Sequence, residues 1–295
     1  MNPSKRLNPH PVSAAPSGLM RLLFNHADAW GLTLIIGSVC LLLHDAFSLP
    51  HLVLILTLAG TAWFAFALND YFDAPFDAHD PLKSARNYFA GHPASPVILL
   101  SSVIILVAIL LILGTFGGRG LIVFGVAFTA AWAYSAPPLR LKRRPGYDLI
   151  THALFVQTAP YAITLILIGV AWQTFDVLLL ALLALSSLGA QLEQQIRDYE
   201  LDRRLERNFT TVIGQKGAAR LLRLVTVGFT LIGVGGAVGG YLPFKLLPFA
   251  LIGAPLIAHR FLRRADAPRS ERLAFGAVIA ALLYTGSLWG AALIR

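Results

Sequence analysis

The sequence predicts an all-α integral membrane protein, a bundle of about nine transmembrane helices. Apolar residues make up 56% of the chain, charged residues make up 13%, and the mean hydropathy is +0.67. A soluble domain carries about 25% charged residues. The apolar runs are about 20 residues long, enough to cross a hydrocarbon core as a helix, and they lack the alternation of membrane strands. They lie at residues 22–44, 49–69, 96–115, 119–136, 150–170, 174–196, 218–240, 243–260 and 272–294.

The positions of the basic residues indicate how these runs are oriented in the membrane. Lys and Arg occupy alternate loops: before the first run and after the second, fourth, sixth and eighth. Of the 24 Lys and Arg residues, only Arg119, Lys245 and Arg295 lie on the opposite side. Because positive loops stay in the cytoplasm, we expect the N-terminus inside the cell and the C-terminus outside. The net charge of +9 is divided among short loops, which indicates contact with membrane lipid and argues against a nucleic-acid partner.

The sequence predicts one folded domain preceded by a short tail. Residues 1–18, rich in proline and polar side chains, predict a disordered cytoplasmic tail, because no apolar segment of a signal peptide follows at once. Residues 19–295 predict a single transmembrane domain, since no loop is long enough to fold separately. The single cysteine, Cys40, lies in the first run and excludes an intramolecular disulfide.

Acidic residues gather at the cytoplasmic end of the second run. Asp70, Asp73, Asp77 and Asp80 lie close together in a chain with 15 Asp and Glu residues. Asn69, Asp73 and Asp77 are four residues apart, which places them on one face of a helix. Like charges at this spacing repel each other, and a bound cation removes the repulsion. Oxygen ligands of this kind suit Mg²⁺, which keeps coordination places for water and phosphate.

A second acidic cluster follows the sixth run in the segment QQIRDYELDRR. Asp198 and Asp202 are again four residues apart, on the same predicted side of the membrane. Together the clusters predict a site for two Mg²⁺ ions that bridge a diphosphate. The alternative is a set of solvated charges balanced by basic neighbours, but two clusters with one spacing on one side argue against it. Asp80, Asp148 and Glu200 fit ordinary solvated charges.

Basic and aromatic side chains near the clusters are candidates for binding the diphosphate. Phosphate oxygens accept charge-assisted hydrogen bonds from Lys and Arg. For the basic loop after the fourth run, anchoring of the membrane topology is the alternative interpretation. The candidates are Lys83, Arg86, Tyr134, Lys142, Arg143 and Arg197.

The two acidic motifs resemble those of the UbiA superfamily of intramembrane prenyltransferases. NDYFDAPFD matches the signature NDxxDxxxD through Asn69, Asp70, Asp73 and Asp77, and DYELD matches DxxxD. The segments YSAPPLRLKRRPG and TTVIG are also similar to family segments, so the resemblance covers about residues 18 to 295. Family members often carry an Arg-Pro pair after the first signature, whereas here Asn87 follows the Arg. We expect a freer backbone at that point.

The resemblance implies helices around a central cavity, with cytoplasmic helical caps and a side opening to lipid. It implies Mg²⁺-dependent transfer of a prenyl group from an isoprenyl diphosphate to an aromatic or other lipophilic acceptor, through an allylic carbocation. Asp73, Asp77, Asp198 and Asp202 are then the catalytic residues. The implied metal ligands are Asn69, Asp70, Asp73, Asp77, Asp198 and Asp202, and the alternative for Asp70 is that it orients the other ligands without binding the metal itself.

Aromatic and polar side chains in the runs are candidates for the prenyl or acceptor pocket. Aromatic faces stabilise a carbocation, although packing or the membrane interface also explains such residues. Polar side chains inside a span line a pocket or form hydrogen bonds between helices. The pocket candidates are Phe66, Tyr71, Trp132, His152, Gln157, Gln191 and Gln194, with Phe64, Phe72 and Gln195 as further members of these groups.

Other functions stay open at this point. A cation-coupled transporter of a lipid or small anion also uses acidic pairs, but the bundle middle lacks an acidic site and no inverted repeat is visible. A non-catalytic lipid-binding protein would not need two sets of metal ligands. Among enzymes, the acceptor remains undetermined. The basic segment, DYELDRR and TTVIG are similar to lycopene elongases, which suggests a carotenoid acceptor.

Overall fold

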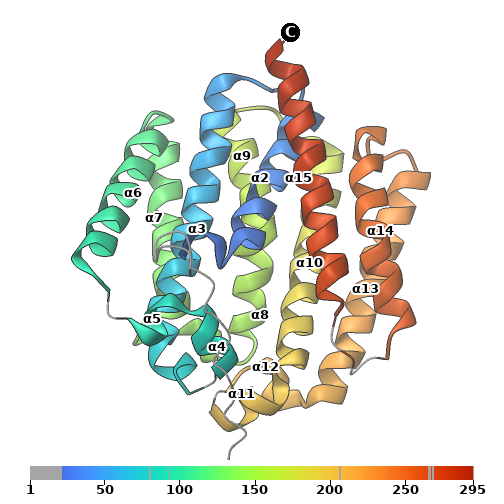
Figure 1. Ribbon diagram of the computed structural model, residues 1–295. Coiled ribbons are helices and arrows are strands. Elements are labelled where there is room, and N and C mark those ends of the chain that lie inside the picture. The colour runs from blue at the N-terminus through green and yellow to red at the C-terminus, as the bar shows by residue number, and fades with distance from the viewer. Residues whose placement is uncertain are drawn as a thin grey trace, which may run out of the picture.

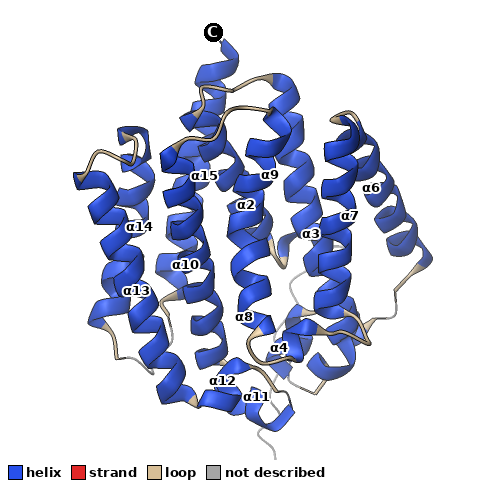
Figure 2. Ribbon diagram, turned by 180° about the vertical axis from the view of Figure 1, so that it is seen from behind, coloured by secondary structure: helices blue, strands red, loops and turns tan. Residues whose placement is uncertain are grey.

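The computed structural model describes residues 22–79, 81–92, 94–205, 207–264, 267 and 269–294. The predicted tail at 1–18 lies outside these residues. Long helices stand side by side in a bundle (Figures 1 and 2), and the described part contains no strand. The all-α prediction is therefore confirmed.

Each predicted apolar run lies on a helix, with short breaks where glycine and proline occur. Seven helical segments of the described chain are long and apolar enough to cross a membrane. The count of nine crossings stays a prediction, because α2 has 17 residues and α7 is not among the seven. The long helices are α2 (Ala27–Leu43), α3 (Leu49–Asp77), α6 (Pro96–Gly114), α7 (Gly117–Ser135), α8 (Tyr147–His152) with the π-helix η2 (Ala153–Thr158) and α9 (Ala159–Ile168), α10 (Thr174–Arg197), α13 (Gln215–Val238), α14 (Leu247–Leu262), preceded by η3 (Phe244–Leu246), and α15 (Glu271–Ile294).

Local sequence fixes where several helices begin and end. The hydroxyl of Ser48 accepts from the backbone N–H of His51 at the start of α3, and Ser95 caps α6 in the same way. Both helices carry proline in the first turn. Proline is tolerated there because the N–H groups of the first turn have no acceptor within the helix. Gly169 ends α9 with φ of 71°, a left-handed conformation that glycine adopts without strain.

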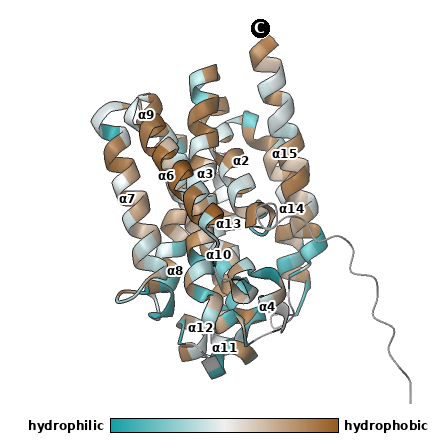
Figure 3. Cartoon of the chain, turned by 60° about the vertical axis from the view of Figure 1, so that its left-hand side comes forward, coloured by the Kyte–Doolittle hydropathy of each residue, from teal (hydrophilic) through white to brown (hydrophobic). Residues whose placement is uncertain are grey.

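The outer surface of the bundle is apolar. Leu262, Val238 and Phe244 expose more than four fifths of their surface, which suits contact with acyl chains. Figure 3 shows apolar colour along the long helices and polar colour around the short helices at one end. Those short helices are α4 (Pro81–Arg86), α5 (Tyr88–Gly91), η1 (Leu141–Arg143), α11 (Tyr199–Leu205) and α12 (Phe209–Ile213).

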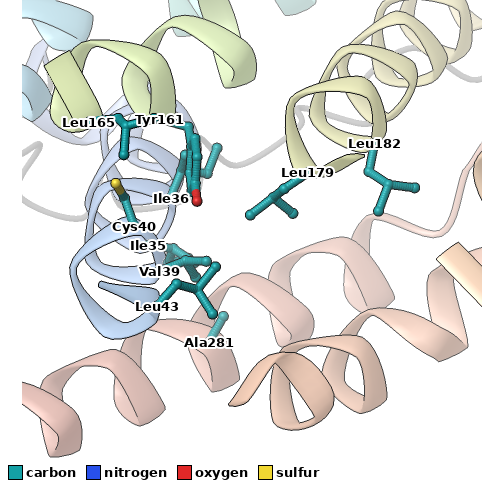
Figure 4. Close-up of a cluster of buried hydrophobic side chains, with 10 residues drawn as sticks. All are labelled: Ile35, Ile36, Val39, Cys40, Leu43, Tyr161, Leu165, Leu179, Leu182 and Ala281. Atoms are coloured by element: carbon teal, nitrogen blue, oxygen red, sulfur yellow. The ribbon is translucent and has the colours of Figure 1, made fainter. Parts of the chain in front are cut away.

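A cluster of buried apolar side chains joins α2, α9, α10 and α15 (Figure 4). Cys40 is fully buried within it and behaves as a small apolar side chain. Beside this cluster, the buried carboxylate of Asp176 accepts hydrogen bonds from the Tyr161 hydroxyl at 2.5 Å and the backbone N–H of Gln173 at 2.7 Å. His44 Nε2 lies 3.0 Å from the same carboxylate. This network ties the ends of α2, α9 and α10 together.

We expect Tyr161→Phe to lower the free energy of unfolding by about 1–3 kcal/mol, because a buried carboxylate loses a donor. Thermal unfolding of the purified protein in detergent measures the change. Tyr241→Phe is the matched control, since the exposed Tyr241 side chain makes no hydrogen bond in the described part. Equal melting temperatures for the two variants would contradict this role of the Tyr161 hydroxyl.

Candidate functional site

A cavity of about 290 Å³ opens between α2, α3, α7, α8, α9 and α10. Its charged residues come from helix ends and loops beside the short helices, whereas the rest of its wall is apolar or carries neutral polar groups. Its charged and amide-bearing residues include Asn69, Asp73, Asp77, Lys83, Lys142, Asp198, Asp202 and Asn208. The two acidic clusters, far apart in the sequence, therefore line one chamber.

On the α3 side, Asp73 is held by two cations. Arg140 Nη2 lies 3.0 Å from Asp73 Oδ1, and Lys142 forms an ion pair with the same oxygen. Asn69 Nδ2 donates to Asp73 Oδ2 at 3.0 Å, while Asn69 Oδ1 accepts from Lys142 Nζ at 2.8 Å and from the Ser135 hydroxyl at 3.2 Å. These bonds aim the amide and carboxylate oxygens toward the cavity end of α7.

Two arginines of the basic loop stack on one aromatic ring. The guanidinium carbon of Arg143 lies 3.8 Å from the centre of the Phe76 ring, and that of Arg140 lies 4.4 Å from it. This cation–π contact holds Arg140 where it reaches Asp73. Arg143 itself does not line the cavity, so its predicted contact with the diphosphate does not fit this arrangement.

Asn87 positions the last carboxylate of the first cluster. Its buried Nδ2 donates to Asp77 Oδ2 and to the carbonyl of Asp70, both at 2.8 Å. Its Oδ1 accepts from the backbone N–H of Phe89 at 2.9 Å and caps α5. The expectation of a freer backbone was wrong, because the side chain that replaces proline anchors the loop to α3.

Asp70 does not line the cavity, so its predicted role as a metal ligand is not supported by its position. It is buried, and its carboxylate accepts from Asn25 Nδ2 at 2.9 Å and lies 2.9 Å from His26 Nε2. The residue lies on a different face of α3 from Asn69, Asp73 and Asp77, because it is one position away from their four-residue spacing. It ties α3 to the segment before α2.

On the α10 side, Asp198 ends the helix and Asp202 lies in α11. Asp198 pairs with Arg197 at 2.9 Å, and Arg197 also reaches Glu271 at 3.1 Å. Buried Asp202 accepts from Asn208 Nδ2 at 2.9 Å, and Lys83 Nζ lies 3.5 Å from its other oxygen. Lys83 follows the first acidic cluster in the chain, so this ion pair bridges the two clusters.

Some of the remaining candidates line the cavity and others do not. Phe66, Tyr134, His152, Gln191 and Gln194 line it, as do Lys83 and Lys142. The other candidates lie elsewhere because their helix faces or loops turn away from the chamber. Those outside its lining are Phe64, Tyr71, Phe72, Arg86, Trp132, Arg143, Gln157 and Arg197.

Three of the residues outside the lining, Tyr71, Trp132 and Gln157, differ in their surroundings. Tyr71 and Trp132 are each about half exposed, and the ring of Phe72 lies 5.3 Å from that of Tyr71 and 5.5 Å from that of Trp132. The three rings form one aromatic cluster. Gln157 is buried, but it does not line the chamber, although its neighbours Phe155 and Val156 on η2 do.

Asp148 is not a solvated charge, contrary to the expectation. It is fully buried and accepts from Gln195 Nε2 at 2.7 Å and the backbone N–H of Phe209 at 2.9 Å. Gln195 Oε1 in turn accepts from the Thr210 hydroxyl at 2.8 Å. The network fixes α12 against α8 and α10. Glu200 is exposed and pairs with Arg203, as expected, and Asp80 lies outside the described residues.

The donor set was tested for its fit to a divalent cation. Within the described residues, three or more acidic, histidine or cysteine side chains do not converge on one point. Each cavity carboxylate instead pairs with a cation or an amide. Because Mg²⁺ takes one or two carboxylates and completes its shell with water and phosphate, five oxygen-bearing side chains on two walls of one chamber fit it.

Comparison with known proteins identifies the family. A sequence model described as the UbiA prenyltransferase family matches residues 31–283. The chain belongs to this family. A lycopene elongase/hydratase of Haloarcula japonica is 33% identical over 107 residues, which is 36% of this chain and 35% of that protein. The one from Corynebacterium glutamicum is 29% identical over 159 residues, covering 53% of this chain and 55% of that protein. The matches therefore span about a third to a half of these relatives.

Solved structures confirm the UbiA fold. A UbiA homolog from Archaeoglobus fulgidus bound to GPP and Mg²⁺ has a TM-score of 0.73 at 20% identity, over 95% of this chain and 100% of that chain. The same homolog bound to DMAPP and Mg²⁺ has a TM-score of 0.69 at 18% identity, over 93% and 99%. With the apolar helices, the UbiA family establishes an integral membrane protein.

Four residues that hold the acidic side chains are not among the candidates predicted from the sequence: Asn87, Ser135, Arg140 and Asn208. Ser135 and Arg140 lie inside the basic motif that carried the family resemblance, and Asn208 directly precedes FTTVIG. Their closeness to those motifs is the feature of the sequence that could have identified these three residues as part of the site. Ser135 and Arg140 bond to residues more than 60 positions away, whereas Asn87 and Asn208 reach carboxylates 10 and 6 positions away across a change of chain direction.

We expect Asp148→Ala to raise hydrogen exchange of the backbone amides at 208–213 by about tenfold or more, since bonds to a buried charge contribute about 1.5–3 kcal/mol. Exchange followed by mass spectrometry measures the effect. Glu200→Ala, which alters an exposed acid, is the control and should leave the same amides protected. Unchanged protection in Asp148→Ala would show that Asp148 does not hold α12.

Proposed function

We propose that this protein transfers a prenyl group from an isoprenyl diphosphate to a lipophilic acceptor inside the membrane, with Mg²⁺ as cofactor. The observation that carries the proposal is the cavity itself. Two acidic segments with basic neighbours meet at one end of a chamber whose remaining wall suits a hydrocarbon chain. Membership of the prenyltransferase family and the GPP, DMAPP and Mg²⁺ in the related structures support it.

The acidic end would hold the metal. Asn69, Asp73, Asp77, Asp198 and Asp202 offer oxygen ligands from opposite walls, and two ions fit the two clusters. When bound, Mg²⁺ neutralises the diphosphate and makes it a better leaving group. In such a reaction, negative charge develops on the leaving diphosphate, and groups that are already in place stabilise it most effectively.

The cavity lysines would bind the diphosphate oxygens directly. Lys142 pairs with Asp73, and Lys83 lies 3.5 Å from Asp202. A metal-bound diphosphate brings anionic oxygens to both carboxylates, so each lysine can exchange its carboxylate for a phosphate oxygen without leaving its position. Tyr134, on the same wall as Ser135, is the remaining cavity-lining candidate for this contact.

The apolar wall would hold the prenyl chain and exclude water. Loss of the diphosphate leaves an allylic carbocation, which water would otherwise trap. Phe66 and Phe155 line the chamber and offer aromatic faces that stabilise a cation. Their position along a mostly apolar wall suits a chain that extends away from the carboxylates.

The composition of the wall favours a neutral acceptor. Among the described residues, its cations are Lys83 and Lys142, and both belong to the acidic end. A carboxylate-bearing acceptor would find no cation deeper in the chamber, and burying it unpaired is unfavourable. A polyene acceptor such as a carotenoid fits this wall, in agreement with the lycopene elongase/hydratase relatives. We propose that the acidic end faces the cytoplasm.

Reconstitution tests the proposal. Purified protein in phospholipid vesicles receives Mg²⁺, radiolabelled dimethylallyl, geranyl or geranylgeranyl diphosphate, and either lycopene or a bacterial lipid extract. Labelled lipid product that requires Mg²⁺ supports the enzyme. Asp73→Ala and Asp198→Ala should abolish it while the protein stays folded. Movement of label across the bilayer without a product would instead indicate a transporter, and full activity in either variant would refute the assigned roles.

Asn87→Ala should raise the Mg²⁺ concentration for half-maximal turnover by about 10–100-fold, because residues that orient metal ligands have effects of this size. Magnesium titrations of the initial transfer rate measure the shift. Asn25→Ala, which removes a bond to Asp70 outside the cavity, is the matched asparagine control and should change the titration less. Identical titrations for Asn87→Ala and the unmodified protein would exclude the positioning of Asp77 by Asn87.

A further inference from the structure

His152 places an imidazole ring in the wall of the chamber, away from its charged end. It is the last residue of α8, directly before η2, and it lines the cavity. Its Nδ1 lies 3.1 Å from the hydroxyl of Ser187 on α10, and that hydroxyl donates to the His152 carbonyl at 2.8 Å. Ser187 is fully buried, so both partners are fixed by packing.

These two bonds assign the tautomer of the ring. A serine hydroxyl has one proton, and here the proton is directed to the His152 carbonyl. The hydroxyl oxygen therefore offers a lone pair to Nδ1, which must carry the hydrogen. In a neutral imidazole the other nitrogen, Nε2, then has a free lone pair. In the described part of the chain, Nε2 makes no hydrogen bond and the ring pairs with no carboxylate.

The depth of His152 suits a reaction next to the diphosphate. Asp148, one turn before it on α8, bonds to Gln195 on α10, so His152 lies about 6 Å inward of that contact. Asp198 lies three residues beyond Gln195 toward the acidic end, which adds about 4 Å. The ring thus lies about one diphosphate length or more inside the carboxylates, with Gln191 and Gln194 in the wall nearby.

Resting on the proposed function, we infer that His152 Nε2 is the base that removes a proton from the prenylated acceptor. The π electrons of a neutral acceptor form a bond to C1 of the prenyl group, and the C1–O pair leaves with the diphosphate. The acceptor is then a carbocation. Nε2 takes a proton from a carbon at or beside the cationic centre, and the C–H pair restores the double bond. His152 becomes an imidazolium, and the proton returns to water after the product leaves.

Other groups of the cavity are less suited to this step. The carboxylates are engaged with cations and amides at the charged end, and the lysines are themselves protonated. The glutamine amides and threonine hydroxyls are very weak bases. Among the described residues of the lining, His152 is the one neutral nitrogen base. Ser187 acts as a positioning residue, because it holds the proton on Nδ1.

The test separates cleavage of the donor from transfer. Vesicles containing the protein receive Mg²⁺, radiolabelled geranyl diphosphate and lycopene or lipid extract, and both diphosphate release and labelled lipid are measured. His152→Gln should keep diphosphate release within about threefold and lower formation of the deprotonated transfer product, identified by its mass, by about 100-fold, the size of a general-base contribution. Label should appear as the free alcohol or as acceptor product heavier by one water. Ser187→Ala should shift products the same way, less strongly.

His259→Gln is the matched control, because His259 lies on α14 and does not line the cavity; it should change neither rate. Formation of the deprotonated transfer product by His152→Gln at the unmodified rate would overturn the inference and indicate that the leaving diphosphate takes the proton. Loss of both rates in His152→Gln and His152→Asn, with unchanged melting, would overturn it too, since His152 would then act in donor binding. If the unmodified protein neither cleaves nor transfers, the proposed function fails and this inference fails with it.

Discussion

The structure depends on keeping carboxylates charged at the edge of an apolar bundle. A carboxylate near hydrocarbon is unfavourable by about 2.5 kcal/mol or more unless it is paired. Every cavity carboxylate accordingly has a partner: Lys142 and Arg140 hold Asp73, Asn87 holds Asp77, and Asn208 and Lys83 hold Asp202. Because several of these partners come from other helices, satisfying the charges also brings the cavity walls together.

The same constraint explains the short helices at one end of the bundle. α4 and α5 carry the partners of Asp202 and Asp77, and the segment around α12 carries Asn208 and the amide that binds Asp148. These segments have too few residues to be stable as isolated helices. Their bonds to these acids hold them beside the acidic residues, so the short helices and the acidic site form as one unit.

The chamber combines two environments that a soluble site rarely brings together. At one end, charged groups are arranged to exchange partners with an anion, and further inside, neutral polar groups stand in an apolar wall. Electrostatic interactions are stronger where water is excluded. Under the proposed function, a diphosphate would be neutralised at the charged end while a hydrocarbon chain lies against the apolar wall. Asn87 anchors the loop after α3 by side-chain bonds to Asp77 and to the carbonyl of Asp70.

The sequence by itself determined the all-α membrane class, the apolar runs and the two acidic motifs, because length, hydropathy and four-residue spacing are local properties of the chain. It also indicated Lys83 and Lys142 through their closeness to those motifs. Only the tertiary structure decided that Asp70 and Tyr71 face away from the cavity, that Asp148 is buried, and that the Ser187 hydroxyl fixes the tautomer of His152. Each of these depends on which face of a helix meets a distant neighbour, and packing between helices sets that rotation.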